Sequence, residues 1–331
     1  MHEMKEKSIK YFNNIIMPLI REKYTDIMDE MSFYIHGSVG LGIDDEFSDV
    51  EAIIHLPDDI WKKRGGYLQI DLDKLLLETN LWSQPCSIIC VHPLSWMINS
   101  NISEIEKILS SEIDVPWSKL SFETLFNIQN DPIWHDPKDR YGRLRIITTP
   151  NKMPEILWKK ALLEKINNFV GGGTQEIHRC IDRRHYLDAY IPFGDAVKAL
   201  LEMGFMVCRQ YYPYQKHLSW AFNRLPSPIS DLKSSFDFLS VSANWQERLR
   251  IMETIYNFYR DYIISNNLLP ELDFNRVDLV EMPLHDNEFN VAKWILDNPN
   301  WRAEQAALME KTLKAGFEPE AARWVGWWEM V

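Results

Sequence analysis

The sequence predicts an α+β fold in which a small domain, with a mixed β-sheet and flanking helices, precedes an all-α helical-bundle domain. Two observations predict this fold. Apolar runs at residues 33–35 and 50–56 lie on either side of a polar turn that contains glycine, which is typical of two neighbouring strands. From Met153 onward, apolar residues recur at helical spacing instead. We expect a sheet domain at 1–150, a helical domain at 151–285 and a helical C-terminal extension at 286–331.

The composition narrows the class of protein. The chain has 331 residues and is 46% hydrophobic, as expected of a globular protein large enough for two domains. Its net charge of -12 argues against broad nucleic-acid binding, which needs a basic surface. No run of 18 apolar residues and no signal peptide are visible, so we expect no membrane span. The cysteines form no Cys-x-x-Cys pair, which argues against a zinc ribbon or a thioredoxin-type site, and scattered, reduced cysteines suit a cytoplasmic location; they are Cys86, Cys90, Cys180 and Cys208.

Several elements are expected around the predicted strands. Residues 9–20 have the apolar spacing of an amphipathic first helix. A short helix at 61–63 is expected to end at Gly65–Gly66, because glycine destabilises a helix interior. Residues 67–77 fit either a half-buried strand or a helix that Asp73 would cap. Residues 86–91 predict a further strand.

The second domain is expected to be helical throughout. Residues 156–169 form one apolar stripe, which Gly171–Gly173 should interrupt as a break or hinge. A second helix is expected at 174–190, with Pro192 ending it, and a third at 194–210.

The predicted pair of strands also carries a candidate site. Gly37 would let a backbone approach a phosphate closely, and the Ser38 hydroxyl can donate to a phosphate oxygen. On a strand, side chains two residues apart share a face, so Asp49 and Glu51 should stand side by side while Val50 faces a core. Two adjacent carboxylates suit Mg²⁺, which binds through one or two carboxylates together with substrate phosphates. The alternative is a β-hairpin with two acids on its solvent face.

Gly-Ser, a spacer of about ten residues and then acid-apolar-acid resembles the signature of the DNA polymerase β-type nucleotidyltransferase superfamily. The similarity is greatest to its small-molecule branch, typified by kanamycin nucleotidyltransferase, and within it to a little-characterised nucleotidyltransferase-like family. The resemblance covers roughly residues 25–230. It implies an Mg²⁺-dependent enzyme that moves an NMP, with AMP from ATP expected, from an NTP to a hydroxyl of a small polar molecule. Gly37 and Ser38 would then hold the triphosphate, and Asp49 and Glu51 the metal.

The superfamily has a third metal carboxylate on a later strand, and there this sequence departs from the pattern. Cys90 stands where that acid is expected, and a thiol is a poor ligand for a hard cation. Asp71 would take the role if residues 67–73 form a strand beside the first two. A simple surface acid is the alternative for Asp71.

The resemblance also implies functional residues in the helical domain. Asp182 and His185 would lie three apart on one helix face, and either would serve as the general base that takes the hydroxyl proton. A block at Arg209–Pro226 resembles a Tyr-x-Pro-Tyr-x-Lys pattern of the family. Within it, Arg209 and Lys216 would contact the β- and γ-phosphates, and Tyr214 would stack on a base or sugar. A solvated helix face and packing aromatics are the alternatives.

Three functions therefore remain open. The first is the nucleotidyltransferase, with an NTP and a small-molecule acceptor as its partners. The second is a non-catalytic nucleotide-binding relative of the fold, which the missing third acid permits. The third is a toxin–antitoxin component that modifies tRNA or a protein, which the acidic charge opposes. The tryptophans of residues 286–331 indicate either a packed core or the contact of a homodimer.

Overall fold

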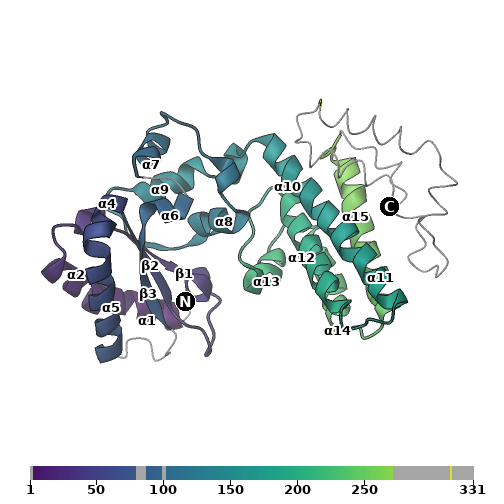
Figure 1. Ribbon diagram of the computed structural model, residues 1–331, viewed down its shortest axis with the longest axis horizontal. Coiled ribbons are helices and arrows are strands. Elements are labelled where there is room, and N and C mark those ends of the chain that lie inside the picture. Colours follow the sequence, from purple (N-terminus) through teal and green to yellow (C-terminus); the bar gives the residue numbers. More distant parts are fainter. Residues whose placement is uncertain (1–2, 80–86, 99–101, 271–313, 315–331) are drawn as a thin grey trace. The chain divides into compact units, whose positions relative to one another are not determined.

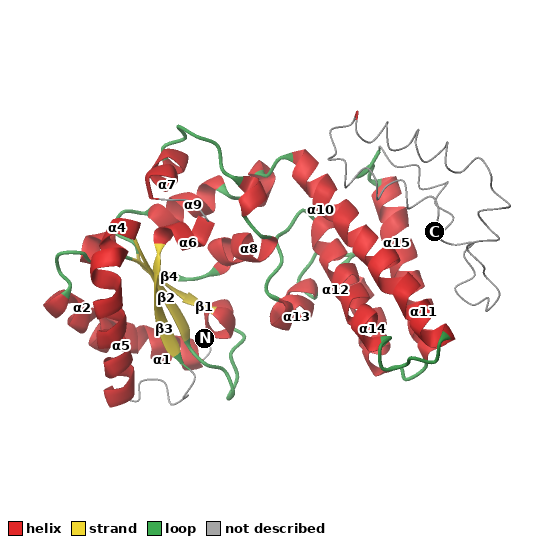
Figure 2. Ribbon diagram, in the orientation of Figure 1, coloured by secondary structure: helices red, strands yellow, loops and turns green. Residues whose placement is uncertain are grey.

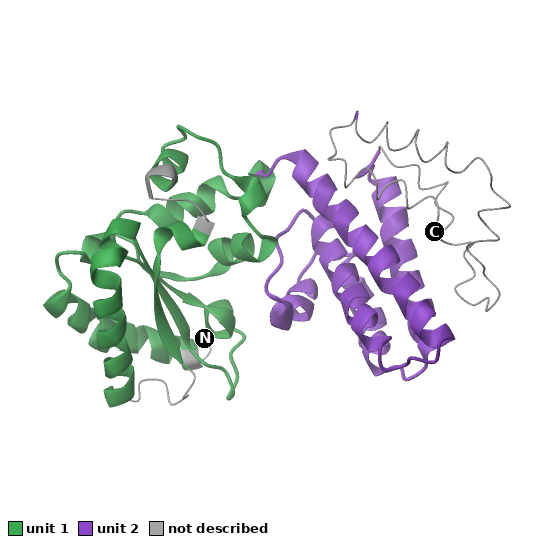
Figure 3. Ribbon diagram, in the orientation of Figure 1, with its two compact units in different colours: residues 1–152 green, residues 153–331 purple. Residues whose placement is uncertain are grey.

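The computed structural model describes residues 3–79, 87–98, 102–270 and 314 (Figure 1). The chain divides into two compact units, residues 1–152 and 153–331 (Figure 3). Unit 1 contains a four-stranded mixed sheet with helices around it, and the described part of unit 2 is helical (Figure 2). These observations confirm the predicted α+β class.

The sheet of unit 1 has the strand order β3-β2-β1-β4. Strand β1 is antiparallel to both of its neighbours, whereas β2 and β3 are parallel. The strands are β1 (Ser32–His36), β2 (Glu51–Leu56), β3 (Ile88–Pro93) and β4 (Ile133–His135). The start of the strand predicted at 86–91 lies partly outside the described residues.

The two faces of the sheet differ in chemistry. One face is apolar and packs against the N-terminal helices and α5 (Gly66–Thr79); its residues are Phe33, Ile35, Ala52, Ile54, Leu56, Ile89 and Val91. The other face carries the alternate residues, which include Tyr34, His36, Glu51, His55, Cys90 and His92. Because side chains alternate along a strand, the register that buries the apolar set also fixes the polar set on one face.

The helices of unit 1 surround this sheet. They are α1 (Glu3–Tyr11), α2 (Met17–Lys23), α3 (Gly37–Leu41), α4 (Asp58–Ile60), α5 (Gly66–Thr79), α6 (Leu94–Ile98), α7 (Ile102–Leu109), α8 (Phe122–Asn130) and α9 (Arg140–Ile147). Two π-helical segments lie among them, Phe12–Ile16 and Trp61–Gly65. Short 3₁₀ turns occur at Met28–Glu30, Trp117–Lys119 and Pro150–Lys152.

The expectation that Gly65–Gly66 would end a helix is wrong. Helix α4 continues through the π-helical segment directly into α5. A Cβ at Gly65 would lie 2.5 Å from Trp61 Cδ1, so the glycine makes room for the indole, whose Nε1 donates to Val91 O at 3.0 Å. This tertiary contact outweighs the low helix propensity of glycine. Residues 67–77 were expected to form either a strand or a helix. They are helical, so the strand interpretation is wrong.

The helices of the described part of unit 2 are α10 (Glu155–Asn167), α11 (Gln175–Asp182), α12 (Tyr190–Val207), α13 (Leu218–Phe222), α14 (Lys233–Val241) and α15 (Trp245–Ser265). A π-helical segment joins the first two, Asn168–Thr174, and 3₁₀ turns occur at Gln215–His217 and Ser230–Leu232. No helix of the described residues is both long and apolar enough to cross a membrane. The tryptophans predicted to pack in residues 286–331 lie outside the described residues.

Two expectations for unit 2 are corrected. Gly171–Gly173 does not break the helix, because the π-helical segment carries the chain through it. A Cβ at Gly173 would lie 2.6 Å from the Cβ of Ala196, so the glycine allows α12 to pack closely there. Pro192 does not end a helix either, since it lies in the first turn of α12, where a missing N–H leaves no bond unmade.

Candidate functional site

The predicted Gly-Ser motif lies at the turn from β1 into α3. Gly37 has φ +69°, a left-handed conformation that favours glycine. A Cβ at Gly37 would lie 2.7 Å from Glu51 Oε2, so a side chain there would collide with the carboxylate. Likewise, a Cβ at Gly40 would lie 2.7 Å from Ile35 O. The two glycines therefore let α3 fold back tightly over the end of β1 and leave Ser38 half-buried beside the turn.

The two predicted metal carboxylates lie at the same end of the sheet. Glu51 begins β2, and its partner across the ladder is His36, the residue before Gly37. Asp49 and Glu51 are half-buried, while Val50 between them is fully buried. The described residues hold no group of three or more His, Cys, Asp or Glu side chains placed to bind a metal ion. Two carboxylate ligands fit Mg²⁺ when phosphate oxygens complete its coordination.

Asp71 does not join this pair. The strand on which its predicted role depended is the helix α5, which packs its Leu68 and Leu72 into the apolar core. The carboxylate of Asp71 instead accepts hydrogen bonds from Lys23 Nζ at 3.2 Å and Tyr24 Oη at 3.0 Å. The bond from Lys23 holds the pKa of Asp71 below its usual value. The prediction of Asp71 as a third metal ligand is therefore corrected: its helical position and ion pair give it a structural role.

Cys90 faces the same side of the sheet as Glu51. On β3 it pairs with Ile53, two residues along β2 from Glu51. Burial raises the pKa of the Cys90 thiol, and the negative charges of Glu51 and Asp73 raise it further. A protonated thiol adds no negative charge to the carboxylate pair, so the sheet presents two acids rather than three at this place.

A residue pair that we did not predict borders the motif. His36 Nδ1 lies 2.8 Å from Oδ2 of Asp131, which follows the end of α8 and is almost completely buried. Burial raises the pKa of the Asp131 carboxyl; the hydrogen bond from His36 opposes this effect, and the charge of Glu51 adds to it. The sequence placed Asp131 only in an Asp-Pro turn before a strand. The position of His36 directly before Gly37 was the one local signal of a role.

The interior of the polar face is filled by aromatic and imidazole rings. Tyr34 Oη and His55 Nε2 are 2.8 Å apart and both groups are buried. Burial lowers the pKa of His55 to about 3, and the nearby His92 lowers it too. Tyr141 of α9 packs on Tyr34 with ring centroids 4.6 Å apart. This cluster supports the strands that carry Glu51 and His36.

The predicted base candidates are not arranged as expected. Helix α11 ends at Asp182, and Arg184 has φ 61°, so the chain leaves the helix before His185. Asp182 and His185 therefore do not share a helix face, which corrects that expectation. Both are exposed, and His185 Nδ1 lies 3.7 Å from Asp188 Oδ2.

The residues of unit 2 that were predicted to contact phosphate and base lie on and near the turn before α13. Tyr214 is 51% exposed and Lys216 is exposed as well. Arg209 forms a bidentate ion pair with Glu155, with 2.6 Å between Nη2 and Oε1. A phosphate contact by Arg209 would require it to leave this pair, whereas Lys216 is not engaged in this way.

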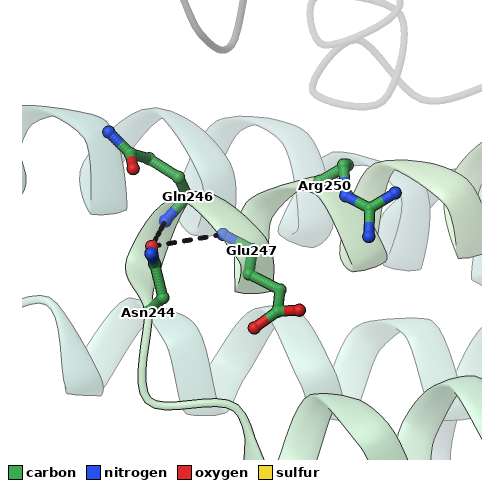
Figure 4. Close-up of a pocket in the computed structure, with 4 residues that line it drawn as sticks. All are labelled: Asn244, Gln246, Glu247 and Arg250. Carbon is green, nitrogen blue, oxygen red and sulfur yellow. Dashed lines mark hydrogen bonds between the residues drawn. The ribbon is translucent and has the colours of Figure 1, made fainter.

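Unit 2 also contains a shallow pocket at the start of α15 (Figure 4). Its described lining residues are Asn244, Gln246, Glu247 and Arg250. The Asn244 side chain caps the helix, accepting from Gln246 N at 2.9 Å and from Glu247 N at 3.5 Å. The side-chain oxygen of Asn244 is thus engaged in a helix cap, and none of the predicted site residues is among the described residues that line this pocket.

Comparisons with known proteins give two findings. A family model described as a domain of unknown function (DUF4037) matches residues 117–220. A solved structure of a nucleotidyltransferase-like protein from Exiguobacterium sibiricum 255-15 is similar to this chain with a TM-score of 0.36 and 12% sequence identity. That similarity covers 78% of this chain and 76% of the other. No curated protein matches the sequence.

Proposed function

We propose that this chain is an Mg²⁺-dependent nucleotidyltransferase that moves an NMP, with AMP from ATP as the first choice, to a hydroxyl of a small polar molecule, so that the bond between the α- and β-phosphates breaks and pyrophosphate leaves. One observation carries the proposal. The Gly37–Ser38 turn and the Asp49–Glu51 carboxylates meet at the same end of two antiparallel strands, with the Glu51 carboxylate directly against Gly37. This juxtaposition supports the proposal, because it brings the turn proposed to bind phosphate close to the acids proposed to bind Mg²⁺.

The roles of the residues follow from their chemistry. The Ser38 hydroxyl would donate to a phosphate oxygen, and Gly37, which is buried against Glu51, supplies the left-handed turn that positions Ser38. Asp49 and Glu51 would hold Mg²⁺, which when bound neutralises charge that develops on the transferring phosphoryl group.

The proposal also gives roles to residues of unit 2, each taken by itself. Lys216 is proposed to contact the β- or γ-phosphate, since its exposed ammonium is available to an anion. Tyr214 would stack on the base or sugar. Arg209 would join them on release from Glu155. Asp182 or His185 would accept the proton of the attacking hydroxyl, each acting separately because they do not share a helix face.

A second candidate function is nucleotide binding without transfer. It is favoured by Cys90, which adds no carboxylate where the superfamily pattern has one. In this case the Gly37–Ser38 turn and the two acids would bind an Mg²⁺–nucleotide complex, and no acceptor would be modified.

Labelled ATP separates the two candidates. The protein is incubated with Mg²⁺, a metabolite extract and ATP labelled at either the α- or the γ-phosphate. Transfer of the α label alone to an acceptor supports the nucleotidyltransferase. Binding of ATP without transfer supports the second candidate, and absence of ATP binding rejects both.

Two double variants make this assay specific for the site. Asp49→Asn with Glu51→Gln should abolish transfer. Asp59→Asn with Glu78→Gln removes the same charge from exposed positions in α4 and α5 and should leave transfer unchanged. Equal loss in both double variants would mean that net charge, and not the carboxylate pair, determines the activity.

A further inference from the structure

We infer that Gln69 closes the β3 edge of the sheet. Its side-chain amide takes the place beside β3 that a residue of a fifth strand would take, and it thereby keeps β3 from pairing with the β3 of a second copy of this chain. The inference uses none of the residues to which the proposed function gives a role, so it stands or falls independently of that function.

Strand β3 is an edge strand. Among the described residues it pairs with β2 alone, since the strand order is β3-β2-β1-β4. Ile88 N donates toward β2, to Val50 O at 3.0 Å. Because backbone groups alternate in direction along a strand, the N–H and C=O groups of Ile89 and Val91 point away from β2. Unpaired groups of this kind are a template on which another chain can add a strand.

The amide of Gln69 on α5 binds two of these groups. Its Nε2 donates to Ile89 O at 2.7 Å, and its Oε1 accepts from Val91 N at 2.8 Å. In a parallel ladder, a residue donates to the carbonyl before its partner and accepts from the N–H after it. The Gln69 amide therefore makes both hydrogen bonds that a residue of a fifth, parallel strand would make opposite Cys90.

The orientation of this amide is fixed by its partners. Nε2 of Gln69 also donates to Asp73 Oδ1 at 2.8 Å, one turn further along α5. Carbonyl and carboxylate oxygens accept, whereas the N–H of Val91 donates, so the nitrogen and oxygen of the amide cannot be exchanged. Leu68 and Leu72 pack into the apolar core and hold this part of α5 against the sheet.

Two further features close other positions of the same edge. Trp61 Nε1 donates to Val91 O at 3.0 Å. Pro93, the last residue of β3, has no N–H to offer to another strand. Gln69 differs from both because it binds a donor and an acceptor of the edge at once. Its loss would expose the pair of groups from which a ladder can begin.

The strand that fits this edge best is β3 of a second copy. In an antiparallel pair centred on Cys90, Ile89 of each copy would lie opposite Val91 of the other and exchange both backbone hydrogen bonds. Such a contact is self-complementary, as a two-fold dimer requires. Ile88 is 46% exposed at the start of the strand and would add apolar contact.

Three substitutions at Gln69 separate its hydrogen bonds from its bulk. Gln69→Leu keeps a side chain of similar size and removes the three bonds. Gln69→Glu keeps an acceptor for Val91 N–H but cannot donate to Ile89 O. Gln69→Ala removes both the bonds and the bulk. The same changes at Gln129 are matched controls, because its amide donates to the Arg145 carbonyl at 2.9 Å and not to a strand.

Two measurements on the full chain test the inference. Hydrogen exchange of the Val91 amide is followed by NMR in protein labelled with ¹⁵N-valine. It should be about tenfold faster in Gln69→Leu and Gln69→Ala than in the wild type, as expected for loss of one hydrogen bond, and intermediate in Gln69→Glu. Sedimentation velocity should show a concentration-dependent association in Gln69→Ala that the wild type lacks. Adding Ile88→Lys should reverse it, because a charge on an edge strand opposes pairing.

Each outcome decides for or against the inference. Unchanged exchange of Val91 in Gln69→Leu overturns it, because the amide then does not protect the edge. Faster exchange without added association in Gln69→Ala also overturns it, since the edge would be open and would still not pair. Association that persists with Ile88→Lys, or that occurs equally in Gln129→Ala, indicates another surface and overturns it too. Circular dichroism checks that each variant is folded. If Gln69→Ala does not fold, the association of Gln69→Leu is decisive in its place.

Discussion

Gly37 and the carboxylate of Glu51 are so close that the smallest side chain at Gly37 would place its Cβ 2.7 Å from Glu51 Oε2. The two residues are 14 positions apart in the chain, as their numbers show. They meet because β1 and β2 are antiparallel and in the register that pairs His36 with Glu51. The Gly-Ser part of the motif therefore packs directly against its acid-x-acid part.

This contact gives the first prediction. Gly37→Ala should lower the free energy of unfolding by about 1–2 kcal/mol, the cost of a left-handed conformation for an L-residue, and should displace Glu51 as well. Gly66→Ala is the matched control, since no atom lies within 4 Å of its added Cβ and it lies in a helix. It should raise stability by about 0.5–1 kcal/mol. Urea denaturation of both variants measures this difference, and opposite signs are expected.

The second prediction concerns the metal. Asp49 and Glu51 alone should bind Mg²⁺ weakly, and much more tightly when a triphosphate supplies further oxygens. ATP affinity by calorimetry should therefore fall when EDTA removes Mg²⁺. In Asp49→Asn with Glu51→Gln the affinity should be low under both conditions. Equal ATP affinity with and without Mg²⁺ in the wild type would contradict the proposed metal site.

The third prediction concerns Cys90. An aspartate at this position would face the same side as Glu51, so without metal the added charge should destabilise the fold. With Mg²⁺ and ATP the three carboxylates should bind together, and the melting temperature of Cys90→Asp should rise more than that of the wild type. Cys90→Ser is the control for loss of the thiol. A shift no larger than that of Cys90→Ser would show that β3 does not reach the metal.

The fourth prediction concerns Lys216. If its ammonium contacts phosphate, Lys216→Ala should weaken ATP binding by about 1–3 kcal/mol, the scale of one charge-assisted contact. Lys233→Ala is the control, because Lys233 is also exposed in the helical unit and pairs with Asp237 at 3.2 Å. Fluorescence titration with a labelled ATP analogue compares the two. Similar affinities for both variants would remove Lys216 from the site.

The fifth prediction concerns acid stability. The pKa of His55 is about 3 in the folded protein and 6.5 in an ordinary peptide, so the unfolded chain binds an extra proton between these values. The contribution of His55 to stability is complete above pH about 6.5 and is lost as the pH falls toward 3, at roughly 1.4 kcal/mol per pH unit. His55→Gln keeps a hydrogen-bonding partner for Tyr34 and removes the titration.

Chemical denaturation between pH 7 and pH 5 tests this relation. The free energy of unfolding should fall less steeply with acid in His55→Gln than in the wild type. The change His135→Gln, made on the edge strand, is expected to leave the wild-type slope unaltered. Equal slopes in the wild type and His55→Gln would show that His55 takes up its proton in the folded state.

Some elements of this fold can be predicted from the pattern of neighbouring residues, and others depend on tertiary contacts. The strands around Gly37 and Glu51 were predictable because alternation and turn residues are properties of neighbouring positions. The continuous helix through Gly65 could not be predicted from local pattern. The indole of Trp61 fills the space that a side chain at residue 65 would need, and its hydrogen bond to Val91 of β3 compensates for the low helix propensity of glycine. The prediction that Asp182 and His185 share a helix face was wrong because the backbone of Arg184, which lies between them, is left-handed.

Some residues of the candidate site could likewise be predicted from the sequence, and others could not. Ser38, Asp49 and Glu51 lie within one hairpin, so their order in the sequence indicates their proximity. Asp131 is 95 positions from His36 and approaches it only because β4 completes the sheet beside β1. A buried carboxylate at that distance leaves no periodic signal. Its role is visible only when the strand order is known.

The difference between the two sheet faces means that an error in strand register would change both the core and the polar face. If β2 slid past β1 by a single residue, Glu51 and His55 would enter the apolar core, and Ile54 would move to the face that now carries Glu51. Such a molecule would lose its stability and its chemistry at the same moment. A preparation of this protein should therefore contain few folded chains with this register error. If the proposed function holds, the fraction that binds nucleotide should equal the fraction that resists proteolysis.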